Sequence, residues 1–307
     1  MTIAIGILAK DGVVIAADSQ LTIQNIWKGS HGKIMALERV KMPGGFLGAC
    51  VVTGATSDFP YLVSLGQEIL GAFELQSHSD PEQSLEAPLR KVVRRFETHH
   101  VVPYRDVVDI AVETIVATSR PFGDELWSTK RSTLSSHSGY VAVGIGAAHA
   151  DALLQRLWRR PQYDVAAAAA LAVFVALSVK ESVDGCGKVT NVVMLQDSAF
   201  HQMPQSLVGR LEEQFSEYFQ AHEPQLVRLM LGVESGPPDG QPDAAELVSG
   251  SLSSMGAAVV GIIGEIRDET PRAHIRAAHR RRAEAAAAKS GREMPAGGSS
   301  GEPPSQE

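Results

Sequence analysis

The sequence has few cysteines, no excess of basic residues and no signal-like N-terminus. Two cysteines in 307 residues, Cys50 and Cys186, cannot build a disulfide framework. The 35 acidic and 28 basic residues give a net charge of −7, whereas binding to nucleic-acid phosphates requires a basic surface, so we expect no nucleic-acid partner. The chain begins without the charged and apolar segments of a signal peptide. These absences together predict a cytoplasmic protein.

Long hydrophobic runs are also missing. The longest apolar stretch, Val165 to Leu177, is rich in alanine and is shorter than the roughly 20 residues that cross a bilayer. We therefore predict a buried core helix in this stretch and no membrane partner. A composition of 44% hydrophobic and 21% charged residues is typical of a globular protein with a sizeable core.

The residue patterns that hold a dinucleotide or a metal are absent too. Gly144 and Gly146 are not followed by the third glycine of a dinucleotide-binding loop, because His149 stands at its position. His99 and His100 are adjacent and point to different faces of any regular element, which disfavours a shared metal ion. We expect neither a cofactor nor a metal.

The chain divides by composition into three segments. Residues 2–200 are dense in strand and helix patterns and are predicted to form the functional domain. Residues 201–282 are predicted to form a C-terminal extension that is partly helical. Residues 283–307 contain too few large apolar side chains to offset the entropy of ordering, so we predict a disordered tail.

The order of elements in the first segment predicts a layered α+β fold. Two β-branched runs, Ile3–Ala9 and Val13–Asp18, are separated by turn residues, which is typical of a tight hairpin. The other strands are expected at Phe46–Val52, Ala111–Thr118, Glu125–Ser128, Tyr140–Val143 and Val189–Leu195. The helices are expected from about Ser57, with Ser57 or Asp58 as its cap, and at Pro81–His99, His149–Trp158 and Val165–Lys180. This order favours packed sheets with helices outside them.

The most informative position for chemistry is Thr2, directly after Met1. A small second residue permits removal of the initiator methionine, which would leave a threonine with a free α-amino group. That amine has a pKa near 8 and can take the hydroxyl proton directly or through a water, so nucleophile and base share one residue. A threonine at this position is common, so the prediction depends on its surroundings.

Several short motifs in order along the chain resemble the proteasome β-subunit family, including the bacterial HslV-type peptidase. They are the threonine start, the segment DGVVIAADSQ at residues 11–20, Lys28-Gly29, Lys33-Ile34 and the turn at residues 54–58. The resemblance covers roughly the first 195 residues. It implies a four-layer αββα sandwich, in which two antiparallel sheets lie between helix layers.

The resemblance also implies roles for individual residues. Thr2 matches the nucleophile, and Lys33 matches the lysine whose ammonium keeps the N-terminal amine basic by lowering its pKa. Asp18 matches the carboxylate that holds this lysine. The Gly54 N–H matches the donor that stabilises the tetrahedral intermediate.

A substrate pocket is implied at Val52, Leu21 and His31. The apolar Val52 predicts a preference for uncharged substrate side chains.

Two positions depart from the family pattern. Ile145 stands between two glycines where the family has an assisting serine. In the segment ESVDGCG, Glu181 and Asp184 stand where the family has an aspartate and a hydroxyl residue. The Asp184 carboxylate is able to take over the hydroxyl's role, although it also favours the protonated amine.

The sequence therefore predicts a threonine-type peptidase acting on peptides or unfolded proteins. The family implies a ring-shaped homo-oligomer and a separate ATP-dependent unfoldase, because this chain carries no nucleotide-binding loop. Two alternatives stay open. The first is an inactive scaffold or assembly protein with the same fold, and the second is an amidase of the same chemistry acting on a small amide.

Overall fold

A computed structural model describes residues 2–23, 27–30, 32–41, 47–56, 59–79, 83–104, 111–158, 163–217, 261–262 and 264. Contacts divide the chain into two units, Met1–Arg267 and Asp268–Glu307, and every described residue belongs to the first. The predicted tail at 283–307 and the predicted caps Ser57 and Asp58 lie outside the described residues.

The first unit contains two five-stranded antiparallel sheets and a separate two-stranded ribbon. The first sheet has the order β10-β1-β2-β11-β12, and the second has the order β5-β6-β7-β8-β9. The strands of the first sheet are β1 (Ile3–Ala9), β2 (Gly12–Asp18), β10 (Tyr140–Gly144), β11 (Thr190–Gln196) and β12 (Ala199–Gln202). Those of the second are β5 (Met35–Lys41), β6 (Leu47–Thr56), β7 (Val112–Arg120), β8 (Gly123–Lys130) and β9 (Thr133–His137). The ribbon pairs β3 (Gln20–Ile23) with β4 (Trp27–Ser30).

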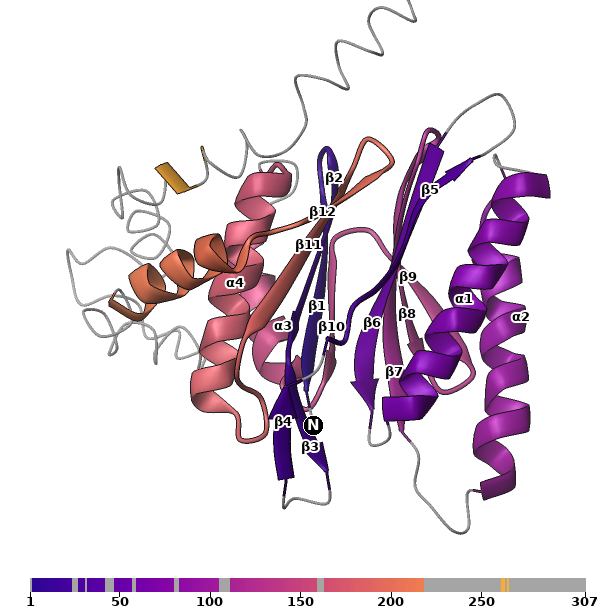
Figure 1. Cartoon of the computed structure of the whole chain (residues 1–307), viewed down its shortest axis with the longest axis horizontal. Helices are drawn as coiled ribbons and strands as arrows, with labels where there is room; N and C mark the ends of the chain where they lie inside the picture. Colours follow the sequence, from indigo (N-terminus) through magenta and orange to yellow (C-terminus); the bar gives the residue numbers. More distant parts are fainter. Residues whose placement is uncertain are drawn as a thin grey trace, which may run out of the picture. The chain divides into compact units, whose positions relative to one another are not determined.

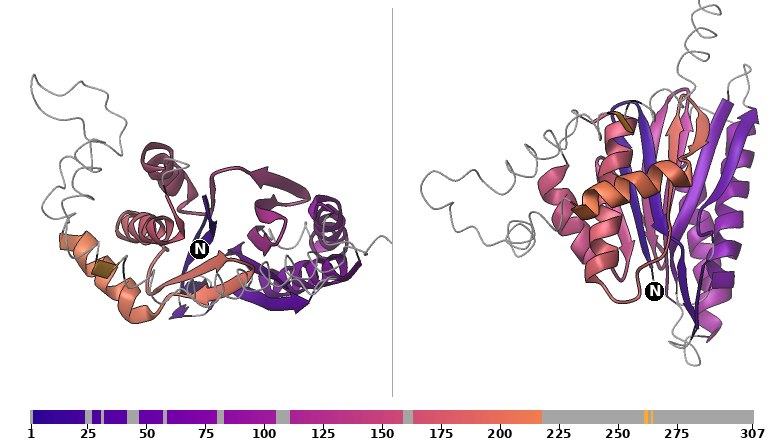
Figure 2. Two further views of the ribbon diagram at one scale, coloured as in Figure 1. Left: turned by 90° about the horizontal axis from the view of Figure 1, so that it is seen from above. Right: turned by 60° about the vertical axis from the view of Figure 1, so that its left-hand side comes forward.

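Helices cover the outer face of each sheet, so the layers run helix, sheet, sheet, helix (Figure 1). The same layering is visible in the turned views of Figure 2. One helix layer holds α3 (Ala147–Leu157) and α4 (Val165–Ser182), and the other holds α1 (Phe59–Ser79) and α2 (Glu86–Phe96). A π-helical turn, η2 (Glu97–Val101), and a 3-10 turn, η3 (Val102–Tyr104), follow α2. The predicted four-layer αββα sandwich is confirmed.

Strand patterning explains why the sheets stack. Every residue of β1 and β2 is buried, because both faces of the first sheet are covered. Along β1, Ile3, Ile5 and Ile7 pack with α4, whereas Ala4 and Leu8 pack against the second sheet. Continuous β-branched runs are typical of strands that are covered on both faces.

The apolar helix α4 lies against the first sheet. It is long and apolar enough to span a membrane by length and composition, with a mean hydropathy of 1.7, yet 78% of it is buried inside the protein. Asp164 caps its start by accepting a hydrogen bond from the Ala167 N–H at 3.0 Å. Its apolar surface therefore serves the core, as the sequence predicted.

Beyond the sheets, residues 205–217 form a helix that packs on α4. Leu207, Leu211 and Phe215 are buried in the same core as α4, and the Phe215 ring meets Phe174 edge-on with 5.2 Å between ring centroids. This helix belongs to the predicted C-terminal extension.

Asp124, at the start of β8, gives a testable effect on stability. Burial raises the pKa of its carboxyl from 3.8 to about 6, and the nearby carboxylates of Asp197, Asp11 and Glu125 add to the rise, while a hydrogen bond from Ser119 opposes it. The unfolded chain then ionises Asp124 more readily than the folded one, so this residue costs stability as the pH rises from about 4 to 6. We expect Asp124→Asn to raise the free energy of unfolding at pH 7.5 by about 1–2 kcal/mol.

The measurement is urea unfolding of the wild type and Asp124→Asn at pH 7.5 and pH 4. The gain should be much smaller at pH 4, where the carboxyl is protonated in the folded protein and only about half ionised in the unfolded chain. The same gain at both values would contradict the titration as its cause.

Candidate active site

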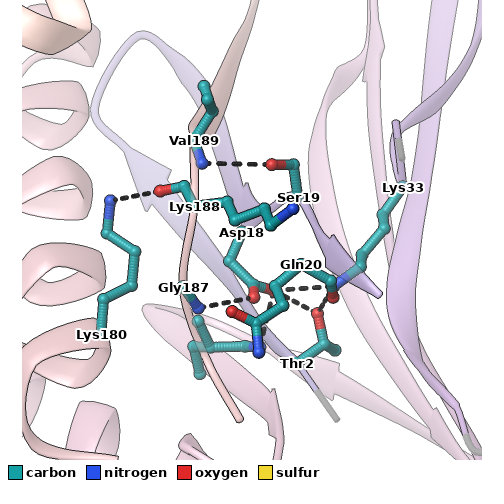
Figure 3. Close-up of polar contacts among 10 residues, drawn as sticks. Thr2, Asp18, Ser19, Gln20, Lys33, Lys180, Gly187, Lys188 and Val189 are labelled. Carbon is teal, nitrogen blue, oxygen red and sulfur yellow. Dashed lines mark hydrogen bonds and ion pairs between the residues drawn. The ribbon is translucent and has the colours of Figure 1, made fainter. Parts of the chain in front are cut away.

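Three buried polar side chains meet at one end of the first sheet. They are Thr2, directly before β1, Asp18, at the end of β2, and Lys33, shortly before β5 (Figure 3). Their exposed fractions are 2%, 0% and 3%. Buried ionised groups are costly unless they are paired and hydrogen-bonded, so a cluster of this kind needs a complete set of partners.

The partners are the cluster's own members and one backbone carbonyl. The Thr2 hydroxyl donates to Asp18 Oδ1 and accepts from Lys33 Nζ. Lys33 Nζ also donates to Asp18 Oδ1 at 2.9 Å and to the carbonyl oxygen of Gln20. An ammonium has three N–H donors, and all three are used here. The Thr2 oxygen thus lies between a carboxylate and a cation.

Backbone groups hold Asp18 from two directions. The Ile3 N–H donates to Asp18 Oδ1 at 3.1 Å, and the Gly187 N–H donates to Asp18 Oδ2 at 3.1 Å. Both carboxylate oxygens therefore have donors, which fixes the plane of the carboxylate relative to Thr2.

Strand register brings these residues together. Ala4 lies opposite Ala17, so the end of β2 falls beside the start of β1, and Asp18 lies opposite Thr190 of β11. On the other side of β1, the Ile145 N–H donates to the carbonyl oxygen of Thr2 at 3.1 Å.

Gly144 has to be a glycine at this point in the fold. Its φ is +103°, and a Cβ there would lie 2.2 Å from the Thr2 carbonyl oxygen. The close approach of β10 to Thr2 therefore requires a residue without a side chain.

Burial sets the electrostatics of Lys33. Desolvation lowers the pKa of its ammonium below 10.5, while the carboxylate of Asp18 opposes that shift. The cation costs free energy to bury, and Asp18 is the charge that keeps it in place.

The position of Gly54 follows from the second sheet. Gly54 lies inside β6 opposite Thr114, whereas the sequence placed it where the strand turns into its helix. The Thr114 N–H donates to Thr129 Oγ1 on β8, so it faces away from β6. Because paired residues in an antiparallel ladder alternate in direction, the Gly54 N–H points to the β5 side. The ladder with β5 begins at Met35 opposite Val52, so this N–H lies beyond its end, on the side where Lys33 lies.

The remaining predicted residues lie elsewhere or outside the description. Asp184 is exposed on the turn after α4, and within the described residues no hydrogen bond joins it to Thr2. Val52 is fully buried in the core beneath α1. Leu21 is in β3 opposite Gly29, and His31 lies outside the described residues.

Sequence reasoning singled out the segment ESVDGCG before β11 for Asp184 but did not identify Gly187 and Cys186 as its residues near the site. Gly187 supplies a donor to Asp18, and Cys186 lies close enough to Lys33 and Asp18 for their charges to act on its thiol. Burial raises the pKa of that thiol to about 11, so it is a poor nucleophile at neutral pH. The strand predicted after this loop was the available signal. Because Thr190 of β11 pairs with Asp18, the residues just before β11 lie beside Asp18.

Among the described residues, no group of three or more histidine, cysteine, aspartate or glutamate side chains is arranged to hold a metal ion. The groups that meet at this site are a hydroxyl, a carboxylate, an ammonium and backbone N–H groups.

Comparisons with known proteins give the same fold. The family model described as proteasome subunit matches residues 2–194. A comparison with curated protein sequences finds no match.

Among solved structures, Anbu (ancestral beta-subunit) from Yersinia bercovieri is 14% identical with a TM-score of 0.55, covering 73% of this chain and 97% of that one. The Anbu (Gly-1) mutant from Hyphomicrobium sp. strain MC1 is 12% identical with a TM-score of 0.57, covering 74% and 100%. The helical assembly of the Anbu complex from Pseudomonas aeruginosa is 14% identical with a TM-score of 0.56, covering 78% and 100%. These likenesses establish a fold of the proteasome type. Since the family model spans more than half of the chain, this protein belongs to the proteasome subunit family.

Proposed function

We propose that this protein is a threonine peptidase whose nucleophile is the Thr2 hydroxyl after cleavage of the Met1–Thr2 bond. The observation that carries the proposal is the buried Thr2 hydroxyl, which is hydrogen-bonded to both Asp18 and Lys33. A threonine with only a structural role needs neither a buried cation nor a buried anion on its oxygen, and burying both is costly.

Cleavage of the Met1–Thr2 bond turns the Thr2 nitrogen into a free amine. The Lys33 ammonium, which contacts the hydroxyl of the same residue, lowers the pKa of this amine by like-charge proximity and keeps it neutral near pH 7. The amine then accepts the hydroxyl proton, directly or through a water, as the oxygen attacks the peptide carbonyl. Asp18 holds Lys33 in its place.

Attack forms a tetrahedral intermediate with negative charge on the former carbonyl oxygen. We assign its stabilisation to the Gly54 N–H, a contribution of about 3 kcal/mol for one such donor. The Thr2 ammonium gives its proton to the leaving amine as the C–N bond breaks, which leaves an ester on Thr2. Water hydrolyses this ester by the same route and restores the free hydroxyl.

The exposed position of Asp184 supports a neutral amine in this scheme. A carboxylate in contact with the amine would favour its protonated form and weaken it as a base. The hydroxyl that the family places at Ile145 is absent, so the proposal assigns proton transfer to the amine and to water alone.

Substrates and partners follow from the same proposal. We propose unfolded polypeptides as substrates, with Leu21 and His31 contributing to a pocket for uncharged side chains. We assign no substrate contact to Val52, which is fully buried in the core. We also propose a cytoplasmic homo-oligomer, in line with the helical assembly described for the Pseudomonas aeruginosa neighbour. A separate ATP-dependent unfoldase would deliver folded substrates.

Intact-mass analysis of the purified protein, followed by a β-lactone or boronate probe, tests the proposal. We expect loss of the mass of Met1 and attachment of the lactone to Thr2, located by peptide mapping. Fluorogenic peptides with uncharged side chains should be turned over by the processed protein. Retention of Met1 in all chains would contradict the proposal.

One observation favours a second function, that of an inactive scaffold. Ile145 stands where the family has an assisting serine and is 51% exposed beside Thr2, so the site lacks that hydroxyl. Processed protein that neither binds the probe nor cleaves peptides would support the scaffold. Probe attachment to Thr2 without peptide turnover would instead indicate an amidase for small amides.

A further inference from the structure

Lys180 and Glu212 form an ion pair that is separated from Asp18 by the segment Gly187–Lys188. Lys180 Nζ lies 2.5 Å from Glu212 Oε1, and the two side chains are only 9% and 23% exposed. The same Nζ donates to the carbonyl oxygen of Lys188 at 3.1 Å. In Figure 3 the segment that carries Gly187 and Lys188 lies between Lys180 and Asp18. The ion pair therefore contacts the loop that in turn contacts the candidate active site.

Glu212 comes from the helix of residues 205–217, which lies outside the family match at 2–194. Its Oε1 also accepts a hydrogen bond from the Thr190 hydroxyl at 2.6 Å. Gln205 Nε2 on the same helix donates to the Thr190 carbonyl oxygen at 3.3 Å. The helix is thus joined to the loop through Lys180 and to the first residue of β11.

The loop is joined to the candidate active site on its other side. The Gly187 N–H donates to Asp18 Oδ2. The Ser19 N–H donates to the Val189 carbonyl oxygen at 2.8 Å, and the Val189 N–H donates to Ser19 Oγ at 3.1 Å. Lys188 has a φ of +60°, a conformation that residues with side chains seldom adopt. Such a backbone persists only where the surroundings fix it, and the Lys180 contact to the Lys188 carbonyl is one of the fixing contacts.

We infer that Lys180 and Glu212 are positioning residues that fix the loop Val183–Val189 and so keep the Gly187 N–H on Asp18. Asp18 in turn orients the Thr2 hydroxyl and Lys33. The effect on catalysis rests on the proposed function, whereas the effect on the loop does not. The C-terminal extension is then required for full activity although it is no part of the family-matched domain.

The first measurement is peptide turnover. Glu212→Gln removes the anion beside Lys180 but keeps an acceptor for Thr190. Because displacement of a reacting group by about 1 Å costs up to about 10²-fold in rate, we expect kcat to fall by about tenfold or more with KM within about twofold of the wild type. Lys180→Met should have the same effect. The matched control is Glu213→Gln, the same change one residue along at an exposed position, and it should leave kcat unchanged.

The second measurement does not require activity. Cys186 is 7% exposed in this loop and Cys50 is fully buried in β6, so N-ethylmaleimide labelling followed by peptide mapping reports on the two regions separately. Local opening controls the reactivity of buried groups. We expect Cys186 to react about tenfold faster or more in Glu212→Gln and Lys180→Met than in the wild type, with Cys50 unreactive.

The outcomes separate this inference from the proposed function. Faster labelling of Cys186 alone, in a protein without peptidase activity, supports the positioning role and contradicts the proposed peptidase function. Unchanged labelling of Cys186 in both variants overturns the inference whatever the activity. Faster labelling of Cys50 together with Cys186 in both variants shows global unfolding, which makes the ion pair a stabilising contact only and overturns its positioning role.

Discussion

Replacement of Thr2 by alanine is expected to lower kcat for peptide hydrolysis by at least about 10³-fold, the loss typical of removing a nucleophile. Alanine keeps the free amine and permits removal of Met1, so the variant loses only the hydroxyl and the methyl group. The hydroxyl is the group held between Asp18 and Lys33, and no other hydroxyl is hydrogen-bonded to either side chain in the described residues. The measurement is turnover of a fluorogenic peptide by the wild type and by Thr2→Ala, each after removal of Met1.

Thr2→Ser is the matched control, because it keeps the hydroxyl and the amine and also permits removal of Met1. We expect it to retain activity within about tenfold of the wild type, since only the methyl group that limits the rotamers is lost. Both variants should show the same loss of the Met1 mass. Equal turnover by Thr2→Ala and the wild type would remove Thr2 from the mechanism.

Replacement of Lys33 by methionine is expected to cost about 3–5 kcal/mol in the free energy of unfolding and to abolish turnover. The cost arises because Asp18, which is 0% exposed, would keep its carboxylate in the core with no cation beside it. Adding Asp18→Asn should recover part of the stability, because the buried charge is then gone. It should recover none of the activity, because the amine of Thr2 still lacks the neighbouring ammonium.

Chemical denaturation gives the stability and the peptide assay gives the rate. Lys130→Met is the control, since Lys130 is 79% exposed in its ion pair with Glu113 and such pairs contribute about 0–1 kcal/mol. Loss of stability in Lys33→Met no larger than in Lys130→Met would mean that Asp18 is satisfied without Lys33. Full turnover by Lys33→Met would exclude the proposed role of its ammonium.

Elements with a strong pattern of their own were predictable from sequence. The β1 and β2 hairpin and the helix α4 were expected within a few residues of their observed bounds, because β-branched runs and an alanine-rich stretch each specify one structure locally. The αββα sandwich came from the order of such elements together with a family resemblance. Thr2, Asp18 and Lys33 came from the same resemblance, and the structure brings them within hydrogen-bonding distance.

Elements that depend on neighbours were not predicted. The strands β3, β4, β5, β9 and β12 are short or carry polar residues, and they form because an adjacent strand supplies hydrogen-bond partners. The third strand was expected to end at Val52 but continues to Thr56, because β7 pairs with it along its whole length. Asp184 was singled out by its spacing, yet its side chain is exposed and the neighbouring Gly187 makes the contact with Asp18.

The amino-acid sequence by itself determined which residue types are available: a threonine after Met1, a lysine and an aspartate on separate segments, and the runs that make the core strands and helices. Only the tertiary structure decided that these side chains meet, that a loop N–H completes the shell of Asp18 and that a helix beyond residue 200 reaches that loop through Lys180. The physical reason is the distance along the chain over which each interaction acts. Strand and helix propensities act over a few residues, whereas Asp18 and Gly187 are 169 positions apart and come together only through the pairing of β2 with β11.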